Sequence, residues 1–282
     1  MGSWVYINDL KGEIMRKSKK QENLEEILLS MLSDKAKLAA ELVFQNEELQ
    51  ALQDYANIVS IKRLGYNDHG PVHMRTAAYN AVLMFNILNN KGIKLNLEAE
   101  NIAKNSDSLV AVFLASFLHD IGMCIARDGH ELNGMFVAQK YIDEILDTVY
   151  EKKEYLLKVA VKNVILEGIM GHMASKKIHT LEAGLVLVGD GCDMAEGRAR
   201  ITTLLRNDPK AGDIHRYSAS SIEKVIIEPG NEKPIRIHIK MNQSVGIFQV
   251  EEVLYPKILN SPIKPFIELY AQVDDLEMLR YL

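Results

Sequence analysis

Six polar side chains stand where the hydrophobic pattern of the chain calls for apolar residues, and all six are of types that bind metal ions. They lie in at least five expected helical segments: His73, His119, Asp120, His130, His172 and Asp190. A single histidine on an apolar face is usually an ordinary core residue. Two buried carboxylates need a partner, because an unpaired charge is costly to remove from water. Imidazole and carboxylate together suit Mn, Fe, Co, Ni or Zn better than Ca. The set therefore predicts a site for divalent transition metal ions.

The adjacent pair His119-Asp120 follows an uncharged run, Val110–Leu118, whose composition predicts a helix buried almost all round. The run is too short to span a bilayer, so we expect no membrane segment. The first residues of the chain lack the basic-then-apolar order of a signal peptide. The low cysteine content, Cys124 and Cys192, is typical of a reducing compartment. We therefore expect a cytoplasmic protein.

The composition is that of a large folded protein with a mild acidic charge. The chain has 282 residues, of which 48% are hydrophobic, and a formal net charge of −5. This apolar content is sufficient for a substantial core. The acidity argues against nucleic acid as a partner, because such binders carry a basic footprint. A homo-oligomer is compatible with the composition.

The periodicity predicts a mainly α protein with a small C-terminal α+β domain. Residues 1–53 are expected as an N-terminal helical extension, with a helical pattern from Gln21 to Leu52 after a mixed start. Residues 54–206 are expected as a helical bundle that holds the metal site. A loop then begins the third part, 207–282, whose expected order is β-β-α-β. Its expected elements are strands at Ser221–Glu228, Ile235–Met241 and Pro265–Val273, with a helix at Val245–Leu259.

Proline and glycine give two local predictions inside the bundle. The Gly-Pro pair before Val72 predicts that a helix begins at Pro71, because the missing N–H of proline costs nothing in a first helical turn. Gly184, Gly189 and Gly191 lie in an apolar helical stretch, where each costs about 1 kcal/mol relative to alanine. Their presence predicts that another segment packs very close to that helix.

The order of these residues resembles the HD-domain superfamily of metal-dependent phosphohydrolases, over about residues 54–200. The segments that carry the resemblance are His73-Met74-Arg75-Thr76-Ala77, Phe117-Leu118-His119-Asp120-Ile121-Gly122, His130-Glu131-Leu132-Asn133-Gly134 and Gly189-Asp190-Gly191. The opening Gly65–His73 is similar to a mostly archaeal subgroup of predicted HD hydrolases with a C-terminal extension. Two departures argue against a cyclic-dinucleotide substrate: Met123 stands where many relatives carry lysine, and the Gly-Tyr-Pro motif of such enzymes is absent.

The resemblance implies two metal ions and a hydrolytic reaction. One ion would be held by His73, His119, Asp120 and Asp190, and the other by His130 and His172 with Asp120 bridging. Two ions about 3.5–4 Å apart make a hydroxide nucleophile available near neutral pH, which gives Asp120 a catalytic role. The implied enzyme is a phosphomonoesterase or phosphodiesterase that acts on a small phosphate ester, with a nucleotide as the favoured substrate.

Five further residues are candidates for contact with the substrate. His69 and His179 could each be an extra ligand, a proton donor to the leaving oxygen or a phosphate contact. Arg75, Arg127 and Arg198 are the basic residues nearest in sequence to the ligands and could supply the counter-charge of a phosphate. The alternative for each arginine is a surface position or a supporting ion pair, and for Arg75 we favour that alternative.

Two other functions fit the same ligands. An HD-type di-iron oxygenase would use all six of them to activate O₂. A non-catalytic nucleotide-sensing module would bind its ligand in the bundle and relay the state through the C-terminal domain. The intact ligand set argues against the sensor, because a site without chemistry has no need of two buried carboxylates. We also expect Asp193 to support a ligand without binding metal itself.

Overall fold

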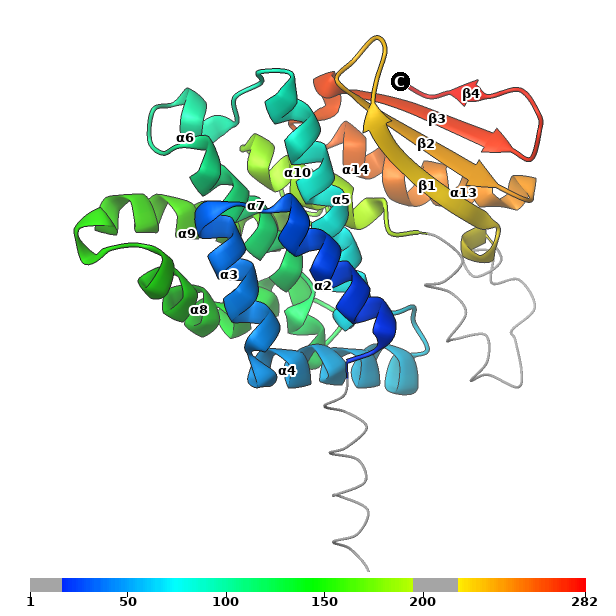
Figure 1. Ribbon diagram of the computed structural model, residues 1–282. Coiled ribbons are helices and arrows are strands. Elements are labelled where there is room, and N and C mark those ends of the chain that lie inside the picture. The colour runs from blue at the N-terminus through cyan, green and yellow to red at the C-terminus, as the bar shows by residue number, and fades with distance from the viewer. Residues whose placement is uncertain (1–16, 195–217) are drawn as a thin grey trace, which may run out of the picture.

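Helices form most of the described chain, and a small sheet lies towards its C-terminal end (Figure 1). The computed structural model describes residues 17–194 and 218–282. The helical part consists of α2 (Lys19–Met31), α3 (Asp34–Gln45), α4 (Glu47–Asn57), η1 (Ile58–Leu64), α5 (Pro71–Asn90), α6 (Asn96–Ala99), α7 (Asn105–Leu118), η2 (Ile121–Cys124), α8 (His130–Val149), η3 (Lys152–Glu154), α9 (Tyr155–Gly171) and α10 (Leu181–Gly191). The expected fold class, mainly α with a small C-terminal α+β unit, is confirmed.

Helix starts follow local signals in the sequence. The side chain of Ser18 accepts a hydrogen bond from the backbone N–H of Gln21 and caps α2. Thr180 caps α10 in the same way through the N–H of Ala183. Pro71 is the first residue of α5, as predicted. Pro71 and Thr180 thus fix where α5 and α10, two helices that carry predicted metal ligands, begin.

Helix α7 is the centre of the bundle and is surrounded by α3, α5, α9 and α10. Every residue from Asp107 to Leu118 is buried, which confirms the prediction for this run. By length and composition alone, Asn105–Cys124 could cross a membrane, but nearly all of it is buried by the rest of the protein. Such burial is typical of a core helix and not of a helix that faces lipid.

The C-terminal unit is a four-stranded sheet with the order β1-β2-β3-β4. Pairing is antiparallel between β1 and β2, parallel between β2 and β3, and antiparallel between β3 and β4. The two parallel strands are joined by a helical stretch. The elements are β1 (Ile222–Pro229), β2 (Ile235–Met241), η4 (Ser244–Gly246), α13 (Ile247–Gln249), η5 (Val250–Leu254), α14 (Tyr255–Leu259), η6 (Lys264–Phe266), β3 (Ile267–Val273) and β4 (Leu279–Arg280). The β-β-α-β order is confirmed, and the two-residue strand β4 adds to it.

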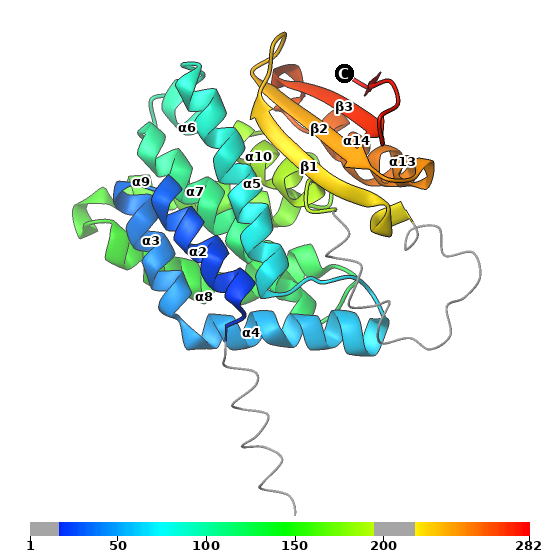
Figure 2. The ribbon, with the colours of Figure 1, turned by 45° about the vertical axis from the view of Figure 1, so that its right-hand side comes forward.

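One hydrophobic cluster joins the three expected parts of the chain. It contains Leu28 and Phe44 from the N-terminal helices, Phe113 from α7, and Ile237 and Leu269 from the sheet. Figure 2 shows the sheet and α14 beside α5 and α10, and these elements are in contact. The boundary at residues 53 and 54 remains a prediction, and the boundary at residues 206 and 207 lies outside the described residues.

The glycines of α10 lie where other segments approach it, as predicted. A Cβ on Gly189 would lie 3.0 Å from the carbonyl oxygen of Ala77 in α5. A Cβ on Gly184 would lie 2.8 Å from Oγ of Ser261, and one on Gly191 would lie 3.1 Å from Cδ of Lys257. Gly184 and Gly191 therefore allow the C-terminal unit to pack close to α10, and Gly189 allows α5 to do so.

Candidate metal centre

The six predicted ligands meet in a single buried cluster. None is more than 5% exposed, and they come from α5, α8 and α10 and from the residues that directly follow α7 and α9. Most stand at helix ends: His73 in the first turn of α5, His119 and Asp120 just after α7, His130 at the start of α8, His172 just after α9, and Asp190 in the last turn of α10. The bundle thus brings several helix ends to one point in its interior.

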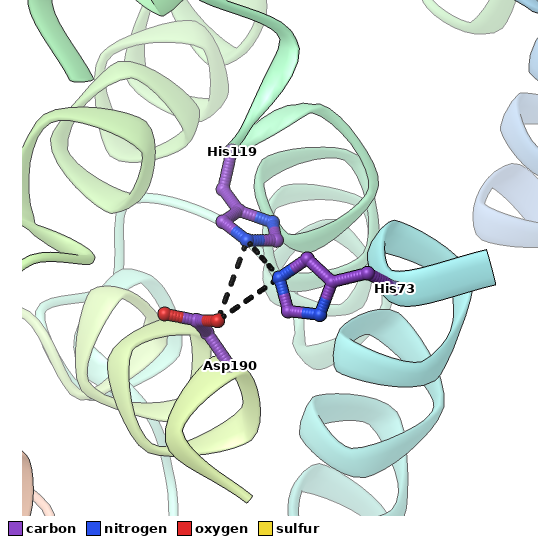
Figure 3. A group of neighbouring side chains, drawn as sticks. All are labelled: His73, His119 and Asp190. Atoms are coloured by element: carbon purple, nitrogen blue, oxygen red, sulfur yellow. Dashed lines mark hydrogen bonds and ion pairs between the residues drawn. The ribbon is translucent and has the colours of Figure 1, made fainter. Parts of the chain in front are cut away.

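The first part of the cluster, which we call the His73 group, contains His73, His119 and Asp190, whose side chains point toward one another in Figure 3. One oxygen of Asp120 completes the group. Nε2 of His73 lies 3.1 Å from Nε2 of His119 and 3.1 Å from Oδ1 of Asp190. The same nitrogen lies 3.2 Å from Oδ2 of Asp120. Four potential ligand atoms from four residues therefore face a common point.

The second part, which we call the His130 group, contains His130, His172 and the other oxygen of Asp120. The two Nε2 atoms lie 3.0 Å apart. Oδ1 of Asp120 lies 3.2 Å from Nε2 of His130 and 3.3 Å from Nε2 of His172. Each oxygen of Asp120 thus faces a different pair of histidines, which is the arrangement of a bridging carboxylate.

The far nitrogen of every ligand histidine is held by an acceptor. In His119 and in His130, Nδ1 lies 2.8 Å from the backbone carbonyl oxygen of another residue. In His172 the corresponding distance is 2.7 Å. Nδ1 of His73 lies 2.6 Å from Oδ2 of Asp193, a contact consistent with the supporting role expected for that aspartate. A carbonyl oxygen can only accept, so Nδ1 carries the proton and Nε2 presents a lone pair to the cluster.

This orientation is suited to metal ions. Two lone pairs about 3 Å apart repel unless a cation lies between them, and each group contains such a pair. Two nitrogens bound to one ion at about 2.0–2.1 Å are separated by about 3–3.4 Å, which matches the observed spacing. The donor set, imidazole with carboxylate, suits a divalent transition metal ion.

The ionisation of the cluster also favours metal binding. Burial lowers the pKa of His172 to about 4, so its imidazole is neutral. Burial alone would raise the pKa of Asp120, but His119 and His69 outweigh it and hold that pKa well below its usual value. Lys257 and His119 do the same for Asp190. Neutral imidazole and ionised carboxylate are the forms that bind metal. Burial alone would lower the pKa of His119, but Asp120 and Asp190 outweigh it and raise that pKa, so an ion that binds there would compete with a proton.

His69 and Arg127 lie beside the cluster, as a substrate contact requires. The His69 ring centroid is 5.8 Å from that of His73, and Nδ1 of His69 lies 2.7 Å from the carbonyl oxygen of Asn67. Its other nitrogen, Nε2, lies 3.4 Å from Nη1 of Arg127. Arg127 is partly exposed and its guanidinium lies over the ring of Tyr66. The pair is the nearest candidate for proton transfer and anion binding.

Arg75 and His179 are not brought to the cluster. The guanidinium of Arg75 is buried and donates five hydrogen bonds, to Glu25, Gln50, Gln53 and the carbonyl of Pro71. Since a guanidinium has five N–H groups, none is left for a substrate, and the supporting ion pair is the correct interpretation. His179 is exposed, and its backbone N–H donates to Glu167. Arg198 lies outside the described residues.

Replacing Arg75 with methionine is expected to lower the free energy of unfolding by about 3 kcal/mol, because Glu25 loses a buried partner. The second partner of Glu25, Lys17, limits the loss. Urea unfolding measures the change, and adding Glu25→Gln is expected to recover part of it. Metal content should stay at the wild-type level, because the Arg75 guanidinium bonds to Glu25, Gln50, Gln53 and Pro71 and not to the cluster.

Lys257 of α14 is part of the cluster and was missed from the sequence. Its ammonium donates to Oδ2 of Asp190 and, at 2.9 Å, to the backbone carbonyl of His172. The residue is 67 positions from Asp190 in a different structural unit. The pattern around it predicts only a helix, so no local signal could have placed it here.

Fold and site together define a helical protein with a buried histidine and aspartate cluster compatible with a metal site. The chain belongs to the same family as a protein of Methanocaldococcus jannaschii, the uncharacterized protein MJ1020. The two are 39% identical over 250 residues, which cover 87% of this chain and 92% of the relative. No family model matches the chain, and no solved structure matches it.

Proposed function

We propose that the protein is an HD-type metal-dependent phosphohydrolase that acts on a small phosphate ester, with a nucleotide as the favoured substrate. The observation that carries the proposal is the orientation of Asp120, whose two oxygens face two separate histidine pairs. A carboxylate shared in this way is what a two-ion site requires. The HD-like order of the ligands in the sequence supports the same assignment.

The ligand set divides naturally between two ions. The His73 group would hold one through two imidazoles and two carboxylates, and the His130 group the other through two imidazoles and the shared Asp120. Mn, Fe, Co, Ni and Zn all suit these donors. When bound, two such ions supply an activated water and neutralise charge on the phosphoryl oxygens.

The residues around the ions would bind and orient the substrate. Arg127, partly exposed beside His69, is placed to pair with a phosphoryl oxygen. Because Nδ1 of His69 is engaged by the carbonyl of Asn67, its Nε2 is the atom that would face the substrate, and this nitrogen would first have to take up a proton in order to pass one to the leaving oxygen. Burial of the cluster keeps bulk water away and strengthens these interactions.

The test is metal analysis of protein purified without chelators, followed by a panel of phosphate esters. We expect two metal equivalents per chain and release of orthophosphate or alcohol from nucleotides or nitrophenyl phosphates. A chelator should abolish turnover, and Mn²⁺ should restore it. O₂-dependent turnover with a mixed-valent iron signal in electron paramagnetic resonance would instead indicate a di-iron oxygenase. Nucleotide binding without turnover of any ester would indicate a sensor.

A further inference from the structure

Lys257 connects the C-terminal unit to both parts of the metal centre. It lies on α14, its side chain is 11% exposed, and its ammonium contacts Oδ2 of Asp190. The same ammonium donates to the carbonyl oxygen of His172. Asp190 belongs to the His73 group and His172 to the His130 group, so one side chain holds a member of each.

The contact with Lys257 determines which oxygen Asp190 presents to the centre. Oδ1 lies 3.1 Å from Nε2 of His73, while Oδ2 is turned away towards the ammonium. Within residues 17–194 and 218–282, Lys257 is the partner of Oδ2. Without it, a carboxylate oxygen in a site only 5% exposed would have no donor, and Asp190 would lose its orientation.

The position of Lys257 depends on close packing between α14 and α10. A Cβ on Gly191 would lie 3.0 Å from Cδ1 of Leu254 and 3.1 Å from Cδ of Lys257. Gly191 therefore lets the lysine stem lie directly over the helix that carries Asp190. A Cβ on Gly184 would lie 2.8 Å from Oγ of Ser261 and 3.1 Å from Cγ2 of Ile263, so this glycine allows the segment after α14 to approach the same helix.

We infer that Lys257 is a positioning residue for metal binding, through which the C-terminal unit completes the centre. The inference rests on the metal site of the proposed function. A positive charge also repels a nearby cation, so the two effects of Lys257 oppose each other. We expect orientation to dominate, because loss of a hydrogen-bond partner to a metal ligand typically lowers metal affinity about 10–100-fold.

The test compares Mn²⁺ binding to wild type and three variants by titration calorimetry. Lys257→Met keeps the length of the side chain without its donors and should lose about 10–100-fold in affinity for one metal equivalent. Lys257→Arg keeps the charge and the N–H groups and should recover part of that loss. Lys264→Met removes an exposed lysine of the same unit and should bind as wild type does. If Lys257→Met does not fold, Lys257→Gln takes its place.

Hydrogen exchange provides a readout that a purely structural lysine would not change. In wild type, Mn²⁺ should slow exchange across Tyr255–Leu259, whereas in Lys257→Met it should not. Mn²⁺ binding by Lys257→Met that equals or exceeds that of wild type overturns the role of Lys257. A wild type that binds no metal overturns the centre itself. If metal binds but no phosphate ester is hydrolysed, only the proposed reaction is overturned.

Discussion

Replacement of Asp120 with asparagine is expected to remove both metal ions and to abolish hydrolysis. Each oxygen of Asp120 faces a different histidine pair, at 3.2 Å from Nε2 of His73 and 3.2 Å from Nε2 of His130. An amide is neutral and has one oxygen, so its NH₂ end would point a donor at one of the two groups. Loss of several kcal/mol of charge stabilisation corresponds to about a 10³-fold or larger decrease in kcat.

Asp193→Asn is the matched control for this prediction. It makes the same chemical change in the same cluster, but Asp193 contacts the far nitrogen of His73 and faces neither metal group directly. It should retain both ions, with a loss of about 10–100-fold in affinity or activity. Metal content by mass spectrometry and initial rates check both variants. Full activity of Asp120→Asn with both ions bound would remove the proposed site.

The fold could be predicted where local patterns decide the structure. The alternation of β2 predicts its strand, with Ile237 and Ile239 buried and Lys240 exposed, and the structure has the predicted bounds. The strand β4 could not be predicted, because its two residues are too few to form a pattern and pair only through Tyr270 and Ala271 of β3. Short elements of this kind depend on tertiary contacts.

The ligands could be predicted because they violate the pattern that surrounds them. Asp190 lies in an apolar helix and His119 ends another, so each is conspicuous as a polar residue in a core. Arg75 shows the limit of this reasoning, because its chemistry suits a phosphate but only the structure shows that it points to Glu25. Lys257 shows a second limit. It fits the pattern of a half-buried helix, so nothing in the sequence indicates its contact with Asp190.

Because each histidine pair is expected to hold its own metal ion, His130→Ala should lose one metal equivalent and keep the other. His130 takes part only in the His130 group, 3.0 Å from Nε2 of His172 and 3.2 Å from Oδ1 of Asp120. The His73 group keeps all four of its ligand atoms in this variant. Turnover should fall about 10²-fold or more, since the remaining ion loses the second positive charge that would help to activate the water and stabilise the phosphoryl oxygens.

Two further variants make this result specific. His73→Ala should remove the ion of the other group, so the two variants should each hold one equivalent, with different spectra when loaded with Co²⁺. His179→Ala, which changes an exposed histidine, should keep both ions and full turnover. Circular dichroism should show the folded state in all three. Crystals grown with excess Mn²⁺ that contain one ion, with His130 and His172 bonded to water or carbonyl groups, would contradict the two-ion mechanism. Asp120 would then serve a single ion through Oδ2, and the lone pairs of His130 and His172 would need a proton between them in place of a metal.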